Sequence, residues 1–208
     1  LHPPATMQAF ESEHRRRTPR AKRSGIREAQ SQMPNRLNKK SSKIVLMLGL
    51  IIAFTLITRL WNLHLPTEYY FDEVYNAFTT QEIVKNNIKS YEWFHTSPVA
   101  GTAYGWTHPP LAKLISALGI KAFGDNSFGW RMGSVVMGTG VIYLTYLIAK
   151  ELMDRKYALI AAFLASLDGL ILVQSRINMN DIYALFFILL AFYFFIKKKM
   201  LFLCISLG

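Results

Sequence analysis

Cysteine is almost absent from this 208-residue chain, and acidic residues are scarce. The single cysteine, Cys204, excludes an intrachain disulfide framework and a cysteine-based zinc site. Residues 1–43 hold 11 basic and 3 acidic side chains, so this segment carries +8 of the net charge of +11. The remaining chain is nearly neutral, which argues against nucleic acid as a partner.

Several familiar ligand-binding patterns are also missing. There is no glycine-rich phosphate loop, no helical pair of histidines at metal-ligand spacing and no internal repeat. No metal site is therefore predicted and no cofactor is certain, although carboxylates and His108 could still assemble a divalent-metal site in space. Residues 1–43 are predicted to form a basic, disordered cytoplasmic tail against anionic lipid headgroups.

Long apolar runs dominate the rest of the chain. A run of 18 residues, at about 1.5 Å per residue, nearly crosses a hydrocarbon core of about 30 Å. The predicted membrane spans are 44–61, 129–149, 157–173 (interrupted by Asp168), 182–196 and an incomplete run at 200–208. The sequence thus predicts an all-α integral membrane protein, a multi-spanning helical bundle.

Basic residues predict the orientation of this bundle. They cluster in the tail, at 150–156 and at 197–199. The positive-inside rule then predicts a cytoplasmic amino terminus, with 62–128 and 174–181 on the far side. The membrane would be the plasma membrane of a prokaryote or the endoplasmic reticulum of a eukaryote. Because the first residue is Leu and the last apolar run stops short, we interpret the chain as the amino-terminal part of a larger protein.

The segment 62–128 is too long and too patterned for a plain connector. Apolar residues at helical spacing predict one helix at 74–87, and Pro109-Pro110 followed by Gly124 predicts a second at 111–124. Both are expected to be amphipathic and to lie along the membrane surface. Asp72-Glu73 at the start of the first helix can be interpreted simply as a cap that favours the helix dipole.

Five short motifs, taken together and in order, resemble the protein O-mannosyltransferase family. They are FDEVYNA at 71–77, THPPLAKLI at 107–115, GWRMGS at 129–134, LDG at 167–169 and SRINMND at 175–181. Two positions depart from the family pattern. Ala112 stands where the family usually has glycine, and Trp106 stands where eukaryotic members often have an acidic residue. These departures favour a prokaryotic member.

The resemblance implies a GT-C-like membrane enzyme with a large first outer loop. Such an enzyme would be an inverting transferase that moves a sugar, expected to be mannose, from a polyprenyl-phosphate donor to a protein Ser/Thr hydroxyl on the extracytoplasmic side. Its partners would be the lipid-linked donor, the protein acceptor and membrane lipids, and a homo- or heterodimer is open. The alternatives are a related transferase acting on a lipid or glycan, a transporter, and a non-catalytic remnant.

One carboxylate and one cation suffice for this chemistry. A hydroxyl needs a base to take its proton, whereas a phosphate leaves without a general acid but gains from a cation. Asp72 matches the family's first acidic position in this loop and is the candidate base. Glu73 is expected to orient the acceptor or to hold the loop, the alternative being a solvated face.

Cationic and polar candidates for substrate binding follow from their place at the outer boundary. Arg131 is the first candidate for the donor phosphate and Arg176 the second, because a guanidinium grips phosphate oxygens in two places. Arg131 could instead be an interfacial arginine that snorkels to water. Arg176 could instead pair with Asp168 or with Asp181, which is otherwise expected to support the site. The weaker candidates are His108, for substrate binding or loop shape, and Lys113, facing water or headgroups.

Overall fold

The computed structural model describes residues 42–92 and 94–207, and all regular structure in those two ranges is helical. The predicted basic tail lies outside the described residues, apart from its last two. The chain divides into two units, Leu1–Leu46 and Met47–Gly208. Of the first unit, the structure describes only the start of the helix Ser42–Leu60.

The helices follow the predicted elements closely. The segment 62–128 contains α3 (Glu73–Val84), the short 3-10 helix η1 (Ile88–Tyr91) and α4 (Leu111–Phe123). After them come α5 (Ser127–Leu152), α6 (Arg155–Leu167), α7 (Gly169–Gln174), α8 (Asn180–Ile196) and α9 (Met200–Leu207). The helix that starts after Pro109-Pro110 ends at Gly124, as the sequence predicts.

Two helices in the described ranges are long and apolar enough to cross a membrane, Ser42–Leu60 and Ser127–Leu152. The apolar helix α8 is shorter. The predicted span 157–173 is not one helix, because α6 ends at Leu167 and α7 begins at Gly169. Asp168 lies between them, and its carboxylate accepts a hydrogen bond of 2.8 Å from the backbone N–H of Ile171. Asp168 therefore interrupts the apolar run as the N-cap residue of α7.

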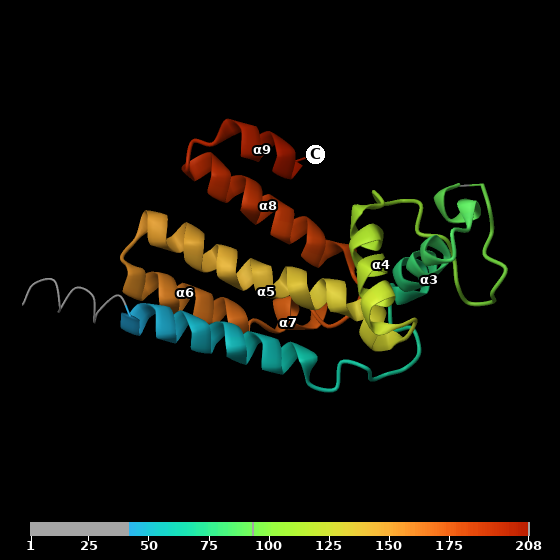
Figure 1. Cartoon of the computed structure of the whole chain (residues 1–208), viewed down its shortest axis with the longest axis horizontal. Coiled ribbons are helices and arrows are strands. Elements are labelled where there is room, and N and C mark those ends of the chain that lie inside the picture. Colours follow the sequence, from blue (N-terminus) through green and yellow to red (C-terminus); the bar gives the residue numbers. More distant parts are fainter. Residues whose placement is uncertain (1–41, 93, 208) are drawn as a thin grey trace, which may run out of the picture. The chain divides into compact units, whose positions relative to one another are not determined.

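Helix α5 is the centre of the helical packing. It packs against α4, α6 and α8, while α3 packs against α4 beyond one end of α5 (Figure 1). One buried core cluster joins three of these helices and consists of Ala112, Val141, Ile182 and Tyr183. Ala112, where the resembled family usually has glycine, therefore places its methyl group in the core.

Helices α4 and α5 approach each other through glycine. A Cβ atom added to Gly119 would overlap the carbonyl oxygen of Gly129, and one added to Gly129 would overlap that of Gly124. Neither obstacle is the end of a flexible side chain that could move aside. The start of α5, which carries Trp130 and Arg131, is therefore positioned by backbone contact with α4.

Gly129→Ala should destabilise the second unit by about 1–3 kcal/mol, the usual cost of overpacking a well-packed core. The measurement is thermal unfolding of the purified chain in detergent. Gly49→Ala is the matched control, since no atom lies within 4 Å of a Cβ at that helical position. Equal melting temperatures for the two variants would contradict the close approach of α4 and α5.

Helix α3 differs from the expected amphipathic surface helix. Its buried residues include the polar side chains of Glu73, Asn76, Thr79 and Thr80. Buried polar groups need hydrogen-bond partners. Glu73, Asn76 and Thr79 find them in α5, in the turn 175–179 and in the segment 103–105, so polar contacts hold α3 in addition to its apolar contacts at Ala77.

Candidate active site

A buried ion pair lies at the start of α3. The Glu73 carboxylate receives hydrogen bonds from Arg131 Nε at 2.7 Å and Arg131 Nη2 at 2.6 Å, and both side chains are almost completely buried. This fork-to-fork geometry is the strongest arrangement for an arginine and a carboxylate. It joins α3 to α5 across 58 residues of sequence.

The other N–H groups of Arg131 bind the segment that precedes α3. Nη1 donates to the carbonyl oxygens of Leu63 and Pro66 at 2.9 and 2.8 Å, and Nη2 donates to that of Glu68 at 3.3 Å. All five N–H donors of the guanidinium are therefore used within the chain. Arg131 is neither exposed to water nor free to grip a phosphate.

Glu73 in turn holds three further donors. Its carboxylate accepts from the Trp130 indole at 3.3 Å, the backbone N–H of Asn178 at 3.1 Å and the backbone N–H of Tyr70 at 3.0 Å. A carboxylate offers about four acceptor positions, and those of Glu73 are filled. The predicted role of holding the loop fits this geometry, and the alternative of a solvated face is wrong.

The turn between α7 and α8 is tied to the same centre. Asn178 accepts from Asn76 through its backbone carbonyl at 3.2 Å, and from Ser116 through its side-chain oxygen at 2.9 Å. Asn180 donates to the Asn76 side chain at 2.9 Å. These asparagines were not among the predicted site residues, although all three lie in the motifs FDEVYNA and SRINMND. Their contacts could not be predicted from spacing, because they span more than 60 residues.

Asp72 differs from its neighbour. It occupies the N-cap position of α3, yet its side chain makes no capping hydrogen bond. Its side chain is half-buried, and among the described residues its carboxylate has no hydrogen bond or ion pair. The residue before it, Phe71, has a left-handed φ of 55°, a conformation that costs a non-glycine residue about 1–3 kcal/mol. Phe71 thus strains the backbone just before Asp72. The Asp72 side chain makes no capping hydrogen bond, although Asp72 stands at the N-cap and Glu73 in the first turn, as the cap interpretation expects.

Arg176 lies in the turn between α7 and α8. Arg176 is half-buried and donates from Nη1 to the carbonyl oxygen of Thr58 at 2.6 Å, while no ion pair with Asp168 or Asp181 forms. Asp181 instead accepts from Gln174 at 3.2 Å. Burial, and then the charge of Arg131, lower the pKa of Arg176.

Arg59 was not predicted as a site residue. Its side chain is fully buried, and Nε and Nη2 have no hydrogen-bond partner in the described chain. Arg59 is the one charged residue in the predicted span 44–61. This position could have identified it as a site residue, because charged residues inside a span usually face a polar cavity or a partner. Arg176 donates to the carbonyl oxygen of Thr58, the residue before Arg59, and within the described residues neither guanidinium forms an ion pair with a carboxylate.

The remaining predicted residues lie on and before α4. Lys113 faces neither water nor headgroups, because it is buried, with Nζ donating to the His108 carbonyl at 3.2 Å. Burial lowers the pKa of the Lys113 amine below its ordinary value of 10.5. The His108 side chain is exposed and lines an apolar cavity of about 560 Å³ between α4, α8 and α9. Lys113 thus holds the His-Pro-Pro turn in place.

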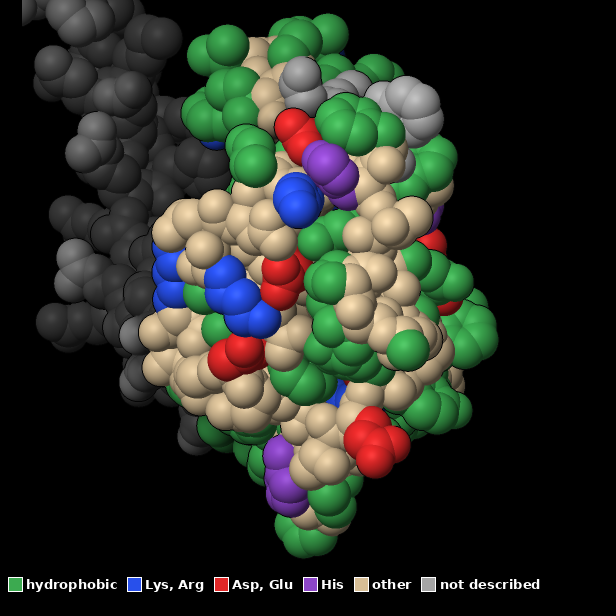
Figure 2. All heavy atoms as spheres, turned by 90° about the vertical axis from the view of Figure 1, so that its right-hand side faces the viewer, with side chains coloured by type: hydrophobic (Ala, Val, Ile, Leu, Met, Phe, Trp, Pro, Cys, Tyr) green, Lys and Arg blue, Asp and Glu red, His purple; other side chains and the backbone are tan. Residues whose placement is uncertain are grey.

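The face seen from the α3 side has no large patch of one charge. Acidic, basic and histidine side chains lie among apolar ones (Figure 2). No group of three metal-ligating side chains occurs within residues 42–92 and 94–207. What this end of the second unit offers is an unpaired carboxylate, Asp72, and the uncompensated cations Arg59 and Arg176.

A comparison of the sequence with protein families identifies the family to which these residues belong. The model of the family described as dolichyl-phosphate-mannose-protein mannosyltransferase matches residues 49–203. The chain belongs to this family. The match includes all five motifs, and therefore Asp72, Glu73 and Arg131 as well as the turn with Arg176.

Curated relatives agree with the family assignment. The polyprenol-phosphate-mannose–protein mannosyltransferase of Corynebacterium glutamicum is 35% identical over 150 residues, 67% of this chain and 27% of that protein. The protein of the same name in Mycolicibacterium smegmatis is 31% identical, over 70% of this chain and 28% of its own length. A dolichyl-phosphate-mannose–protein mannosyltransferase of Schizosaccharomyces pombe is 28% identical over 76% of this chain and 21% of its length.

The actinobacterial relatives support the predicted prokaryotic origin of the chain. The chain spans little more than a quarter of the length of those relatives. No solved structure matched it.

One predicted assignment has to change. Arg131 was the first candidate for the donor phosphate, but its guanidinium is already saturated by Glu73 and three backbone carbonyls. Arg176 uses one N–H in a hydrogen bond to the described chain. Within the described residues, Arg176 and Arg59 therefore both keep N–H donors without a partner, and Arg176 is the more exposed of the two.

Proposed function

We propose that this chain forms the amino-terminal membrane region of a mannosyltransferase that transfers mannose from a polyprenyl phosphate to a Ser or Thr hydroxyl of a protein. The amino terminus is on the cytoplasmic side, and the site lies at the extracytoplasmic boundary of a multi-spanning bundle. Support comes from the family match and from the basic clusters at 150–156 and 197–199, which lie at the opposite ends of α5 and α8 from the site.

The chemistry is a single displacement with inversion. The acceptor oxygen forms a bond to C1 of mannose, while the bond from C1 to the phosphate oxygen breaks. The hydroxyl proton passes to the Asp72 carboxylate, and the electron pair of the broken bond leaves on the polyprenyl phosphate. One base is enough because the phosphate departs without a proton.

The observation that carries this proposal is the contrast between Asp72 and Glu73. The Asp72 carboxylate is half-buried and has no hydrogen-bond partner in the described residues, whereas the Glu73 carboxylate is buried and its acceptor positions are filled. A base must be free to reach a substrate proton, and it must be positioned by rigid neighbours. Glu73 and Arg131 supply that rigidity, since they join α3, α5 and the turn at Asn178.

The donor phosphate is assigned to Arg176. This guanidinium is half-buried, keeps donors free and lies in the turn that binds α3. Arg59, near the end of the helix Ser42–Leu60, adds a second positive charge. Positive charge near the departing phosphate lowers the barrier, because the negative charge grows there as the bond breaks.

Arg176→Gln should lower kcat/KM for the donor roughly 10- to 100-fold, the value of a hydrogen bond to a charged group. The assay uses membranes from a host that expresses the complete gene, a polyprenyl-phosphate mannose donor and a Ser/Thr peptide. Arg155→Gln, at an exposed position on α6, is the matched control and should have wild-type activity.

The same assay tests the function itself. Transfer of mannose to the peptide is the expected result for the unaltered protein. Transfer to a lipid or glycan instead of the peptide would assign the acceptor to another class. Solute transport by vesicles without any sugar donor, together with no transfer, would contradict the proposal.

A further inference from the structure

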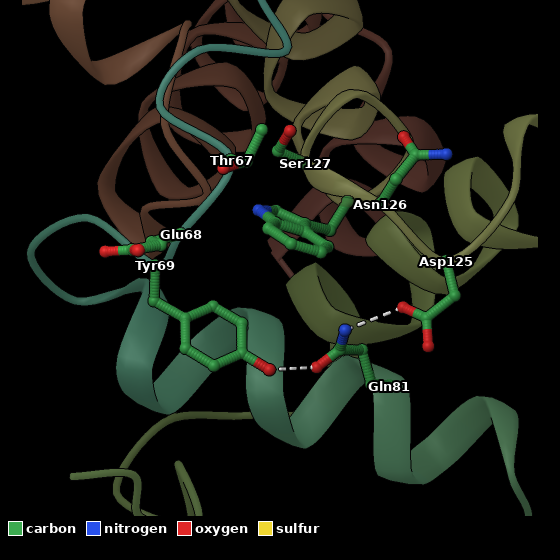
Figure 3. Close-up of a pocket in the computed structure, with 8 residues that line it drawn as sticks. Thr67, Glu68, Tyr69, Gln81, Asp125, Asn126 and Ser127 are labelled. Atoms are coloured by element: carbon green, nitrogen blue, oxygen red, sulfur yellow. Dashed lines mark hydrogen bonds between the residues drawn. The ribbon is translucent and has the colours of Figure 1, made fainter.

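A pocket lies beside Trp130. It has a volume of about 490 Å³, within the range of about 300–1,000 Å³ that is usual for small-molecule sites. Its walls come from the segment before α3, from α3 itself and from the start of α5 (Figure 3). The lining residues are Thr67, Glu68, Tyr69, Gln81, Asp125, Asn126, Ser127 and Trp130.

Two aromatic rings form one wall. The rings of Tyr69 and Trp130 have centroids 5.5 Å apart and are tilted by 46°. Trp130 is held in place because its indole N–H donates to Glu73, the carboxylate beside the proposed base. The wall is therefore rigid, and it is connected directly to the candidate active site.

A chain of hydrogen bonds starts at the same Tyr69 side chain. The Tyr69 hydroxyl donates to the Gln81 carbonyl oxygen, and the Gln81 amide donates to Asp125 at 2.7 Å (Figure 3). Burial, and then the nearby charge of Asp125, raise the pKa of the Tyr69 hydroxyl, so the phenol keeps its proton. Gln81 is thus fixed, with its amide group presented at the pocket.

The charge of the lining decides which ligands fit. It contains two carboxylates, Glu68 and Asp125, and no Lys, Arg or His. An anion such as a phosphate would be repelled, whereas a ligand with many hydroxyl groups can donate to the carboxylates and the amide oxygens. A flat, apolar face on the same ligand would pack on the aromatic wall.

We propose that this pocket binds one neutral hexopyranose residue, which has a ring face of C–H groups and a rim of hydroxyls. The choice of mannose as that hexose rests on the proposed function. The sugar is either a free mannoside or a mannose already attached to the acceptor protein. In the second case the pocket holds a glycosylated segment, and Trp130 and Glu73 connect its occupancy to the site at Asp72.

The test is binding of methyl α-mannoside to the 208-residue chain in lipid nanodiscs, measured by saturation-transfer NMR. Asp125→Asn and Gln81→Leu should each weaken binding at least tenfold. Asp154→Asn is the matched control, because this exposed N-cap residue of α6 makes no side-chain capping bond. Tyr69→Phe removes only one hydroxyl, so it tests the pocket even if the other variants unfold.

The same titration with a mannosylated Ser/Thr peptide separates the two sources of the sugar. Binding of the peptide at least tenfold tighter than the free mannoside assigns the pocket to the attached sugar. Binding of an unglycosylated peptide, lost in Asp125→Asn, would overturn the proposal in favour of a peptide site. No mannoside binding, or equal binding by all variants, would also overturn it.

Failure of this inference is distinguishable from failure of the proposed function. Mannoside binding requires no donor and no base, so Asp72→Asn should bind the sugar like the unaltered chain. Sugar binding without any mannosyl transfer would refute the proposed function, and the proposal that the pocket binds a sugar would stand. Transfer without sugar binding would refute the pocket alone.

Discussion

Asp72→Asn should lower the rate of mannose transfer about 10²- to 10⁴-fold, because an amide cannot take the proton from the acceptor hydroxyl. The protein should still insert and fold, since the Asp72 side chain has no hydrogen bond to lose within the described residues. The measurement is transfer from a polyprenyl-phosphate mannose donor to a Ser/Thr peptide in membranes, with donor and peptide both at saturating concentration.

Two controls make this result specific. Asp154→Asn makes the same chemical change at an exposed position on another helix and should retain full activity. Melting temperatures should be the same for the two variants and the unaltered protein. If Asp72→Asn keeps full activity, Asp72 is not the base and the proposed mechanism fails at its first step.

Arg131→Met should have the largest effect on stability, a loss of about 3–5 kcal/mol. Removing one partner of a buried ion pair leaves the other charge buried and uncompensated. Here the charge left behind is Glu73, which has no exposure to water. The carbonyl oxygens of Leu63, Pro66 and Glu68 also lose their donor. Thermal or denaturant unfolding in detergent measures the loss.

A double-mutant cycle isolates the ion pair from the other contacts of Arg131. Glu73→Gln should also destabilise, and the double variant should lose less than the sum of the two single variants. Arg155→Met serves as the control for removing an exposed arginine and should change stability by less than about 0.5 kcal/mol. A small loss for Arg131→Met, comparable with that control, would mean that the pair does not organise the site.

These two predictions separate the roles of neighbouring residues. Asp72 should affect the rate and hardly the stability, whereas Arg131 should affect the stability first and the rate through it. A phosphate-binding arginine would behave differently, raising KM for the donor when replaced, and that behaviour is expected of Arg176. The three variants together therefore distinguish base, scaffold and donor-binding residue.

Much of the fold could be predicted because its signals are local. The helix 111–123 lies between Pro110 and Gly124, and the apolar run before Trp61 forms the helix Ser42–Leu60. The predicted interruption at Asp168 is observed as well, and it splits the run into two helices. Apolar periodicity, proline and glycine act within a few residues, so a sequence alone displays them.

The site was predicted only in part. The motifs identified Asp72, Glu73, Arg131 and Arg176 as a group, but not which of them is saturated. Arg131 and Glu73 are both ionisable residues at a predicted membrane boundary, and spacing cannot show that they use their hydrogen bonds on each other. Asn178 and Trp130 complete that network from turns and helices far away in the sequence.

The sequence by itself determined that the protein is helical and rich in apolar runs, that its basic residues cluster, and that it carries the motifs of the mannosyltransferase family. These properties depend on residue type and short spacing. Only the tertiary structure decided that Arg131 is a scaffold, that Asp72 is the free carboxylate and that Tyr69, Gln81 and Asp125 line one pocket. Burial and the choice of hydrogen-bond partner arise when distant segments pack together, and no local pattern encodes them.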